Sequence, residues 1–138
     1  MSDISSNYDT DFLENLDNLE VLTVMGNYVD LKGASKAEKL KSVAVMLCRF
    51  NELSELKKCS QIESLVIYNC ERSFDARWID GLKLKILDFN GAEIKNYEYI
   101  KKIDTLETLY LYFCTLTQEQ IDEIQESLPK CTIEVDFL

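Results

Sequence analysis

The sequence predicts an α/β fold made of repeated units, and a recurring nine-residue pattern is the main reason. Residues Leu106–Cys114 read LETLYLYFC, with leucines at the first, fourth and sixth places and a cysteine at the ninth. The same places are apolar or Asn/Cys-like in four earlier stretches. Their first residues, spaced 21, 22, 22 and 22 positions apart up to Leu106, are Leu19, Leu40, Ile62 and Leu84. A repeat of this period predicts stacked units that share one continuous core.

Each unit has a strand pattern followed by a return segment. The first unit reads VLTVMGN from Val21, an alternation that is typical of a strand. Apolar residues then recur every three positions in the second and fourth units: Phe50, Leu53, Leu56 and Cys59, and Ile94, Tyr97, Ile100 and Ile103. This spacing suits one-turn 3₁₀ or short α segments. A further step of 22 predicts a sixth strand, with Cys131 and Ile133 at its fourth and sixth places and Asp136 at the ninth.

The pattern resembles the short 22-residue class of the leucine-rich repeat family. The resemblance implies a right-handed solenoid of six units, with a parallel sheet on the concave side and 3₁₀ turns and short helices on the convex side. It also implies that the ninth-place side chain hydrogen-bonds to backbone in the turn after the strand. That place holds Asn27, Cys48, Cys70, Ala92 and Cys114.

We expect one domain over residues 1–138, divided into an N-terminal cap (1–18), five repeats (19–127), and a final strand with the C-terminal cap (128–138). Phe12, Leu13 and Leu16 are placed to cover the open end of the first repeat. Two capping boxes are expected: Ser35 with Glu38, and Thr117 with Gln120. The third unit departs from the pattern, and we expect Phe74, Trp78 and Ile79 to pack there instead of Arg72 and Asp75.

The chemistry-bearing residue types favour structure over catalysis. Histidine is absent, which removes the usual general base and a common zinc ligand. The five cysteines, at 48, 59, 70, 114 and 131, fall on repeat positions and predict small buried residues with free thiols. We therefore predict no enzyme activity, no catalytic residues, no cofactor and no metal site.

The net charge of the chain indicates which class of partner it can bind. The formal net charge of −10 argues against nucleic-acid binding, since phosphate backbones need clustered Lys and Arg. A basic protein is the natural complement, although net charge also serves solubility. No stretch approaches the roughly 20 apolar residues of a membrane span, and the start lacks a secretory pattern, so we expect a cytoplasmic protein without a membrane partner that is monomeric when free.

The strand residues that point away from the core form the candidate binding surface. The fifth- and seventh-place columns and their neighbours contain more methionine, tyrosine and aliphatic side chains than solubility requires. β-propensity alone would also place such residues on strands. The predicted partner-binding residues are Met25, Met46, Val66, Tyr68, Asp88, Asn90, Tyr110, Tyr112, Phe113 and Glu134.

The sequence thus predicts a non-enzymatic protein-binding module. The finer hypothesis is a small acidic inhibitor, similar to bacterial immunity proteins, whose concave face covers a basic toxin or enzyme such as a nuclease. The alternative is a constitutive adaptor or scaffold subunit of a larger protein complex. The salt dependence of the association rate would distinguish them, because only a charge-steered inhibitor should bind more slowly as salt rises.

Overall fold

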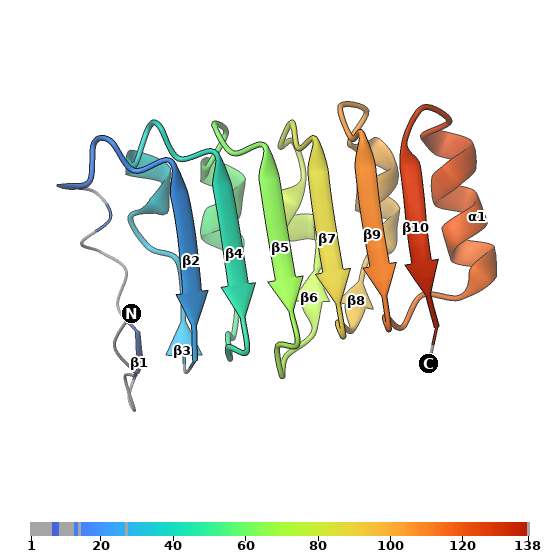
Figure 1. The fold of residues 1–138 in the computed structure, drawn as a ribbon, viewed down its shortest axis with the longest axis horizontal. Coiled ribbons are helices and arrows are strands. Elements are labelled where there is room, and N and C mark those ends of the chain that lie inside the picture. Colours follow the sequence, from blue (N-terminus) through green and yellow to red (C-terminus); the bar gives the residue numbers. More distant parts are fainter. Residues whose placement is uncertain (1–6, 9–12, 14, 27, 138) are drawn as a thin grey trace.

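Six parallel strands form the main sheet of the computed structural model, which describes residues 7–8, 13, 15–26 and 28–137 (Figure 1). Their order along the sheet is β10-β9-β7-β5-β4-β2, so successive units lie side by side. The strands are β2 (Val21–Met25), β4 (Ser42–Met46), β5 (Ser64–Tyr68), β7 (Ile86–Asn90), β9 (Thr108–Tyr112) and β10 (Thr132–Asp136). This is the predicted α/β leucine-rich repeat solenoid.

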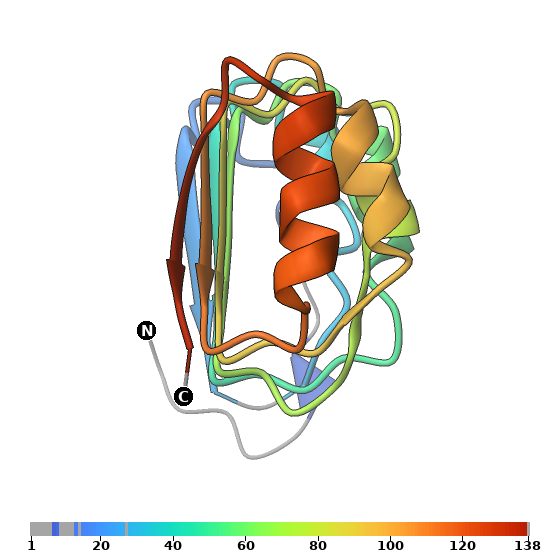
Figure 2. The ribbon, with the colours of Figure 1, turned by 90° about the vertical axis from the view of Figure 1, so that its right-hand side faces the viewer.

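The return segments after β2, β4, β5, β7 and β9 carry helices that cover one face of the sheet (Figure 2). Four are 3₁₀ helices of three to six residues: η2 (Ala34–Lys36), η3 (Ser54–Lys58), η4 (Ala76–Ile79) and η5 (Tyr97–Lys102). The fifth unit returns through α1 (Gln118–Ser127) instead. The prediction of 3₁₀ turns with a short C-terminal helix is confirmed. None of these helices is long and apolar enough to cross a membrane.

Two small parallel sheets of two strands each are separate from the main sheet. One joins β1 (Asn7–Tyr8) to β3 (Tyr28–Val29), and the other joins β6 (Phe74–Asp75) to β8 (Ile94–Lys95). In the second of these, Phe74 is paired with Ile94 and Asp75 with Lys95. The irregular third unit is therefore tied to the fourth by backbone pairing on the return side.

The first-, fourth- and sixth-place residues fill the space between sheet and helices. In β9, Leu109 is fully buried and Leu111 is 1% exposed, while Leu22 and Val24 of β2 are 8% and 2% exposed. Alternation sends every second side chain of a strand to the same side, so this pattern fixes which side faces the core. The buried column runs unbroken from β2 to β9.

The fifth unit is two residues longer than predicted. Ile133 pairs with Leu109 and Val135 with Leu111, which makes the step between these units 24 residues instead of 22. Ile133 and Val135 therefore take the fourth and sixth places, and Cys131 precedes the strand. The prediction of Cys131 and Ile133 at those places, with Asp136 at the ninth, was wrong because the return through α1 uses two more residues than the 3₁₀ returns.

Local predictions at the helix starts and the ends of the array had mixed outcomes. Thr117 caps α1 in a complete capping box with Gln120, as predicted. The box expected from Ser35 and Glu38 is wrong: η2 begins after Gly33, and the Ser35 hydroxyl instead donates to Glu55 (3.3 Å). In the N-terminal cap Leu13 is fully buried and Leu16 is 39% exposed. Phe12 and Asn27 lie outside the described residues.

The third unit packs as predicted. Phe74 and Ile79 are fully buried, Arg72 is exposed, and Trp78 is partly buried against the core. Its ring stands edge-on to Phe74, with 5.2 Å between ring centroids. The aromatic side chains therefore replace the three-residue apolar spacing of the neighbouring units.

The ninth-place cysteines hydrogen-bond to backbone, as the resemblance implied. Each thiol of Cys48, Cys70 and Cys114 lies within 3.1 to 3.6 Å of a carbonyl two residues earlier and of a carbonyl in the preceding strand. All five cysteines are free, but only Cys48, Cys59 and Cys131 are buried. The prediction of burial was wrong for Cys70 and Cys114, which are half-buried at the end of the sheet.

Candidate functional site

The face of the main sheet opposite the helices is covered by no helix or strand of the described chain (Figure 2). We call it the open face. It consists of the third-, fifth- and seventh-place side chains, which are half-buried or exposed on all six strands. Because the strands are parallel and in register, residues of one place form a straight row across the sheet.

Nine of the ten predicted binding residues lie on this open face, and the structure brings them together in two rows. The fifth-place row runs through Val66, Asp88 and Tyr110 to Glu134, which the register of β10 moves there from the predicted seventh place. The seventh-place row contains Met25, Met46, Tyr68, Asn90 and Tyr112. Phe113 lies one residue beyond β9, in the turn. Their role in binding a partner stays a prediction.

The open face has two chemically different halves. On β2, β4 and β5 its outward positions carry no charged side chain, and Met25 (48% exposed) and Val21 (63% exposed) are its most exposed apolar members. On β7, β9 and β10 the outward positions carry Asp88, Glu134 and Asp136 and no Lys or Arg. We call these the apolar half and the acidic half.

Asp88 lies at the junction of the two halves. Val66 of β5 pairs with it on one side and Tyr110 of β9 on the other. Its Oδ1 atom is buried and has no hydrogen-bond partner, unlike every other buried side-chain oxygen or nitrogen in the described residues. Burial raises the pKa of this carboxyl above its ordinary value of 3.8. One oxygen of this carboxyl is thus held in a partly desolvated place without a hydrogen-bond partner.

The tyrosines of β9 are arranged beside Asp88 by contacts on the same face. The rings of Tyr110 and Tyr112 lie 5.8 Å apart with an interplanar angle of 35°. The Tyr112 hydroxyl donates to Glu134 Oε2 at 2.8 Å. This hydrogen bond, with burial and the nearby carboxylates, raises the pKa of Tyr112 to about 12. Both the ring and the hydroxyl are therefore held in place before any partner arrives.

A row of charges runs along the upstream end of the strands, and sequence reasoning missed it. Glu63 stands between two lysines, with Lys41 Nζ and Lys85 Nζ each 3.8 Å from one of its carboxylate oxygens. The second places of successive units alternate in sign, and that alternation could have revealed the row: Glu20, Lys41, Glu63, Lys85 and Glu107. Charges at this edge compensate one another, whereas those of the acidic half do not.

The eighth place of each of the first five units has a left-handed backbone, which sequence reasoning also missed. Gly26, Asn69 and Gly91 adopt positive φ there, as these residue types do readily. Leu47 and Phe113, both with φ of 54°, adopt it too, although their side chains are 53% and 40% exposed. The two glycines at the eighth place were the available signal. Exposed apolar residues in an unfavourable conformation border the open face along its downstream edge.

The thiols are poorly suited to nucleophilic chemistry. Burial is the main cause that raises the pKa of Cys48 to about 11 and that of Cys59 to about 12. A thiol with such a pKa remains protonated at neutral pH, and the thiolate is the reactive species. Within the described residues no three Cys, Asp or Glu side chains converge as a metal site would require.

Comparisons with known proteins agree with the fold. No protein-family model and no curated protein sequence matches the chain. Among solved structures, a leucine-rich repeat protein of Leptospira interrogans superposes with a TM-score of 0.74 at 20% sequence identity. The match covers 95% of this chain but 34% of that one, so the chain spans about a third of its length. The likeness is one of fold: the chain has a leucine-rich repeat solenoid.

Proposed function

We propose that this chain is a non-enzymatic protein-binding module whose open face takes a basic partner. The observation that carries the proposal is the buried, unpartnered Oδ1 of Asp88. Such an acceptor costs free energy in the isolated protein, and a Lys or Arg of a partner placed over Asp88 would stabilise its ionised form. Glu134 and Asp136, which lack a cation on this face, extend the same preference.

The finer proposal is a small cytoplasmic inhibitor of the immunity type, monomeric when free. Its acidic half would lie over the basic active site of a toxin or enzyme such as a nuclease. The net charge of −10 would steer a basic partner toward the chain at low salt. The paired tyrosines would then contribute apolar contact and hydroxyls at the centre of the interface, where tyrosine is enriched among energetically dominant residues.

The apolar half favours a second candidate, a constitutive adaptor or scaffold subunit. Val21, Met25 and Met46 offer uncharged ground of the kind found in long-lived interfaces. A partner held there would associate at a rate that depends little on salt. The two candidates thus differ in which half of the open face binds.

The decisive experiment compares matched variants of the full chain. The wild type, the double variant Tyr110→Ala with Tyr112→Ala, and the control Tyr99→Ala are immobilised in parallel and exposed to a lysate of the source cells. Tyr99 is a half-buried tyrosine of η5, on the helical side. We expect one partner to bind the wild type and Tyr99→Ala, and to bind the double variant at least about thirtyfold more weakly. Equal binding to all three would exclude the open face.

The captured partner then separates the two candidates. With purified components, the inhibitor hypothesis predicts an association rate that falls steeply between low and physiological salt and a loss of the partner's enzymatic activity. Asp88→Asn should lower the association rate at low salt and weaken the inhibition of the partner. The exposed control Asp104→Asn should change neither quantity. A salt-independent rate with unchanged partner activity would favour the scaffold.

A further inference from the structure

A cavity of about 290 Å³ lies on the return side, away from the open face. Three successive units contribute to it, and its polar and aromatic lining includes Asn51, Arg72, Ser73, Asp75, Trp78 and Lys95. Asp75 and Lys95 are register partners in the small sheet of β6 and β8, so backbone pairing holds two sides of the cavity together. The cavity therefore belongs to the irregular third unit, where the repeat pattern is broken.

The aromatic wall of this cavity is fixed in position. The Trp78 ring stands edge-on to Phe50 at 5.7 Å and to Phe74 at 5.2 Å, with interplanar angles of 82° and 84°. Phe74 in turn packs on Phe89 at 5.2 Å. All three phenylalanines are fully buried, so Trp78 is anchored to the core while part of its surface stays accessible. A wall that is rigid before binding lowers the entropic cost of holding a ligand.

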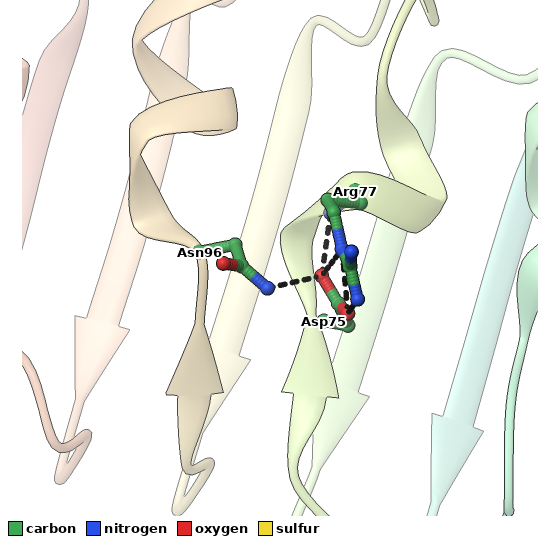
Figure 3. Close-up of polar contacts among 3 residues, drawn as sticks. All are labelled: Asp75, Arg77 and Asn96. Atoms are coloured by element: carbon green, nitrogen blue, oxygen red, sulfur yellow. Dashed lines mark hydrogen bonds and ion pairs between the residues drawn. The ribbon is translucent and has the colours of Figure 1, made fainter.

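The one carboxylate in the cavity, that of Asp75, already has an ion-pair partner within the chain. Asp75 accepts from Arg77 Nη2 at 2.7 Å and from Asn96 Nδ2 at 2.9 Å (Figure 3). Arg77 Nε donates to Asp75 Oδ1 at 3.1 Å while Nη2 donates to Oδ2, which makes the pair bidentate. These bonds lower the pKa of Asp75 to about 2, with the Arg77 side chain as the largest cause. Asp75 therefore stays ionised and stays occupied.

Two cations in the cavity have no such compensation. Arg72 and Lys95 are both exposed, and the side chain of neither takes part in an ion pair or hydrogen bond among the described residues. Glu71, the acid next to Arg72 in the chain, is engaged by Arg49, whose Nε lies 2.6 Å from Glu71 Oε2. The chain as a whole has a net charge of −10, so a cavity with two uncompensated positive side chains differs from the rest of the molecule.

We propose that this cavity binds a small aromatic anion, with its carboxylate or phosphate on Arg72 and Lys95 and its flat ring on Trp78. A guanidinium presents paired N–H groups that match carboxylate and phosphate oxygens. The Ser73 hydroxyl and the Asn51 amide supply neutral donors in the same cavity. The volume is at the small end for ligand sites and fits a single ring with one anionic group. The site is independent of the proposed function.

The chain contains one tryptophan, so Trp78 fluorescence reports on this cavity alone. The full-length protein is titrated at low salt with phenyl phosphate, benzoate, inorganic phosphate and the neutral analogue benzamide. We expect saturable changes with phenyl phosphate and benzoate, at least tenfold weaker binding of inorganic phosphate, and no saturation with benzamide. No saturable change with either aromatic anion would overturn the proposal. Equal affinity for inorganic phosphate, or saturation by benzamide, would also overturn it.

Charge variants complete the test. Arg72→Gln and Lys95→Gln should each weaken phenyl phosphate binding at least tenfold, while Lys83→Gln, an exposed lysine outside the cavity, should leave it unchanged. Each substituted side chain is exposed, and an unchanged unfolding midpoint would show that the fold is intact. The indole N–H resonance of Trp78 supplies a second readout. If all three variants bind alike, the anion does not lie on Arg72 and Lys95, and the assignment fails.

Discussion

The two faces of the main sheet are made by alternate residues of the same strands, yet they obey different rules. On the core side, Leu109 and Leu111 repeat the residue types of the neighbouring units and are almost completely buried. On the open face, Tyr110 and Tyr112 share no such type with their row neighbours Asp88 and Asn90. The difference teaches that packing in the core imposes the 22-residue repeat of apolar residues. The open face is under no such packing constraint, so its residues can be chosen for contact with a partner.

The largest expected effect tests the core side of this comparison. Leu109→Ala should lower the free energy of unfolding by about 2–5 kcal/mol, because the cavity left between β7 and β10 cannot close fully. Denaturant unfolding followed by circular dichroism measures it. Tyr110→Ala, one residue away and on the open face, is the matched control and should cost much less. Comparable losses in both variants would mean that the two faces do not differ as described.

The same packing rule explains how much of the fold the sequence could predict. Unit boundaries, strand positions and the core columns follow from burying an apolar residue at fixed places, and they were predicted for β2 to β9. The register of β10 was not, because the return through α1 has the rise of an α-helix and adds two residues. Ser35 and Glu38 show the complementary failure: the residue types suit a capping box, but η2 is too short to use one.

An intermediate effect tests the acidic half. Asp88→Asn should raise the free energy of unfolding at neutral pH, by an amount on the order of 1 kcal/mol, because it removes a charge that is partly desolvated. The folded pKa of Asp88 lies above the ordinary 3.8, so the folded state binds more protons between the two values. Wild-type stability from this group is therefore present at acid pH and lost as pH rises through the raised pKa.

The measurement is a pair of urea unfolding series across that pH window. The difference between Asp88→Asn and the wild type should shrink as the pH falls, since the wild-type carboxyl becomes neutral. Asp75→Asn is the opposite case, because the pKa of Asp75 is lowered to about 2. Its contribution is present above the ordinary value and lost as the pH falls toward 2, so this variant should be less stable than the wild type at neutral pH. If both substitutions changed the free energy of unfolding in the same direction at neutral pH, the two aspartates would not differ as described.

The open face was predictable in membership but not in chemistry. Alternation alone placed Met25, Tyr68 and Tyr112 on one side, because a strand has a period of two. The missing partner of Asp88 and the hydrogen bond from Tyr112 to Glu134 depend on which residues become neighbours across strands. For Glu134 that neighbour changed with the register of β10. The spacing of residues in the sequence does not show which side chains become neighbours across strands once a return segment changes length.

The smallest expected effect concerns the eighth place. Its row contains apolar residues, for which a positive φ is unfavourable, beside residue types that tolerate it. Leu47 adopts a φ of 54° and is 53% exposed, whereas Asn69, one unit on in the same row, adopts a φ of 45° with a residue type that tolerates it. Leu47→Asn exchanges partial burial of an apolar side chain for relief of backbone strain. We expect the free energy of unfolding to stay the same or to rise by up to about 0.5 kcal/mol, although a leucine is being replaced by a polar residue.

Denaturant unfolding of Leu47→Asn beside Leu53→Asn separates strain from burial, since Leu53 is fully buried and has no positive φ. The buried variant should lose several kcal/mol, because it places an amide in the core. If Leu47→Asn is instead destabilised by more than about 1 kcal/mol, Leu47 contributes to packing and its conformation needs no further reason. If stability is kept while partner binding weakens, the strained leucine is retained for the partner, and the downstream edge of the open face belongs to the interface.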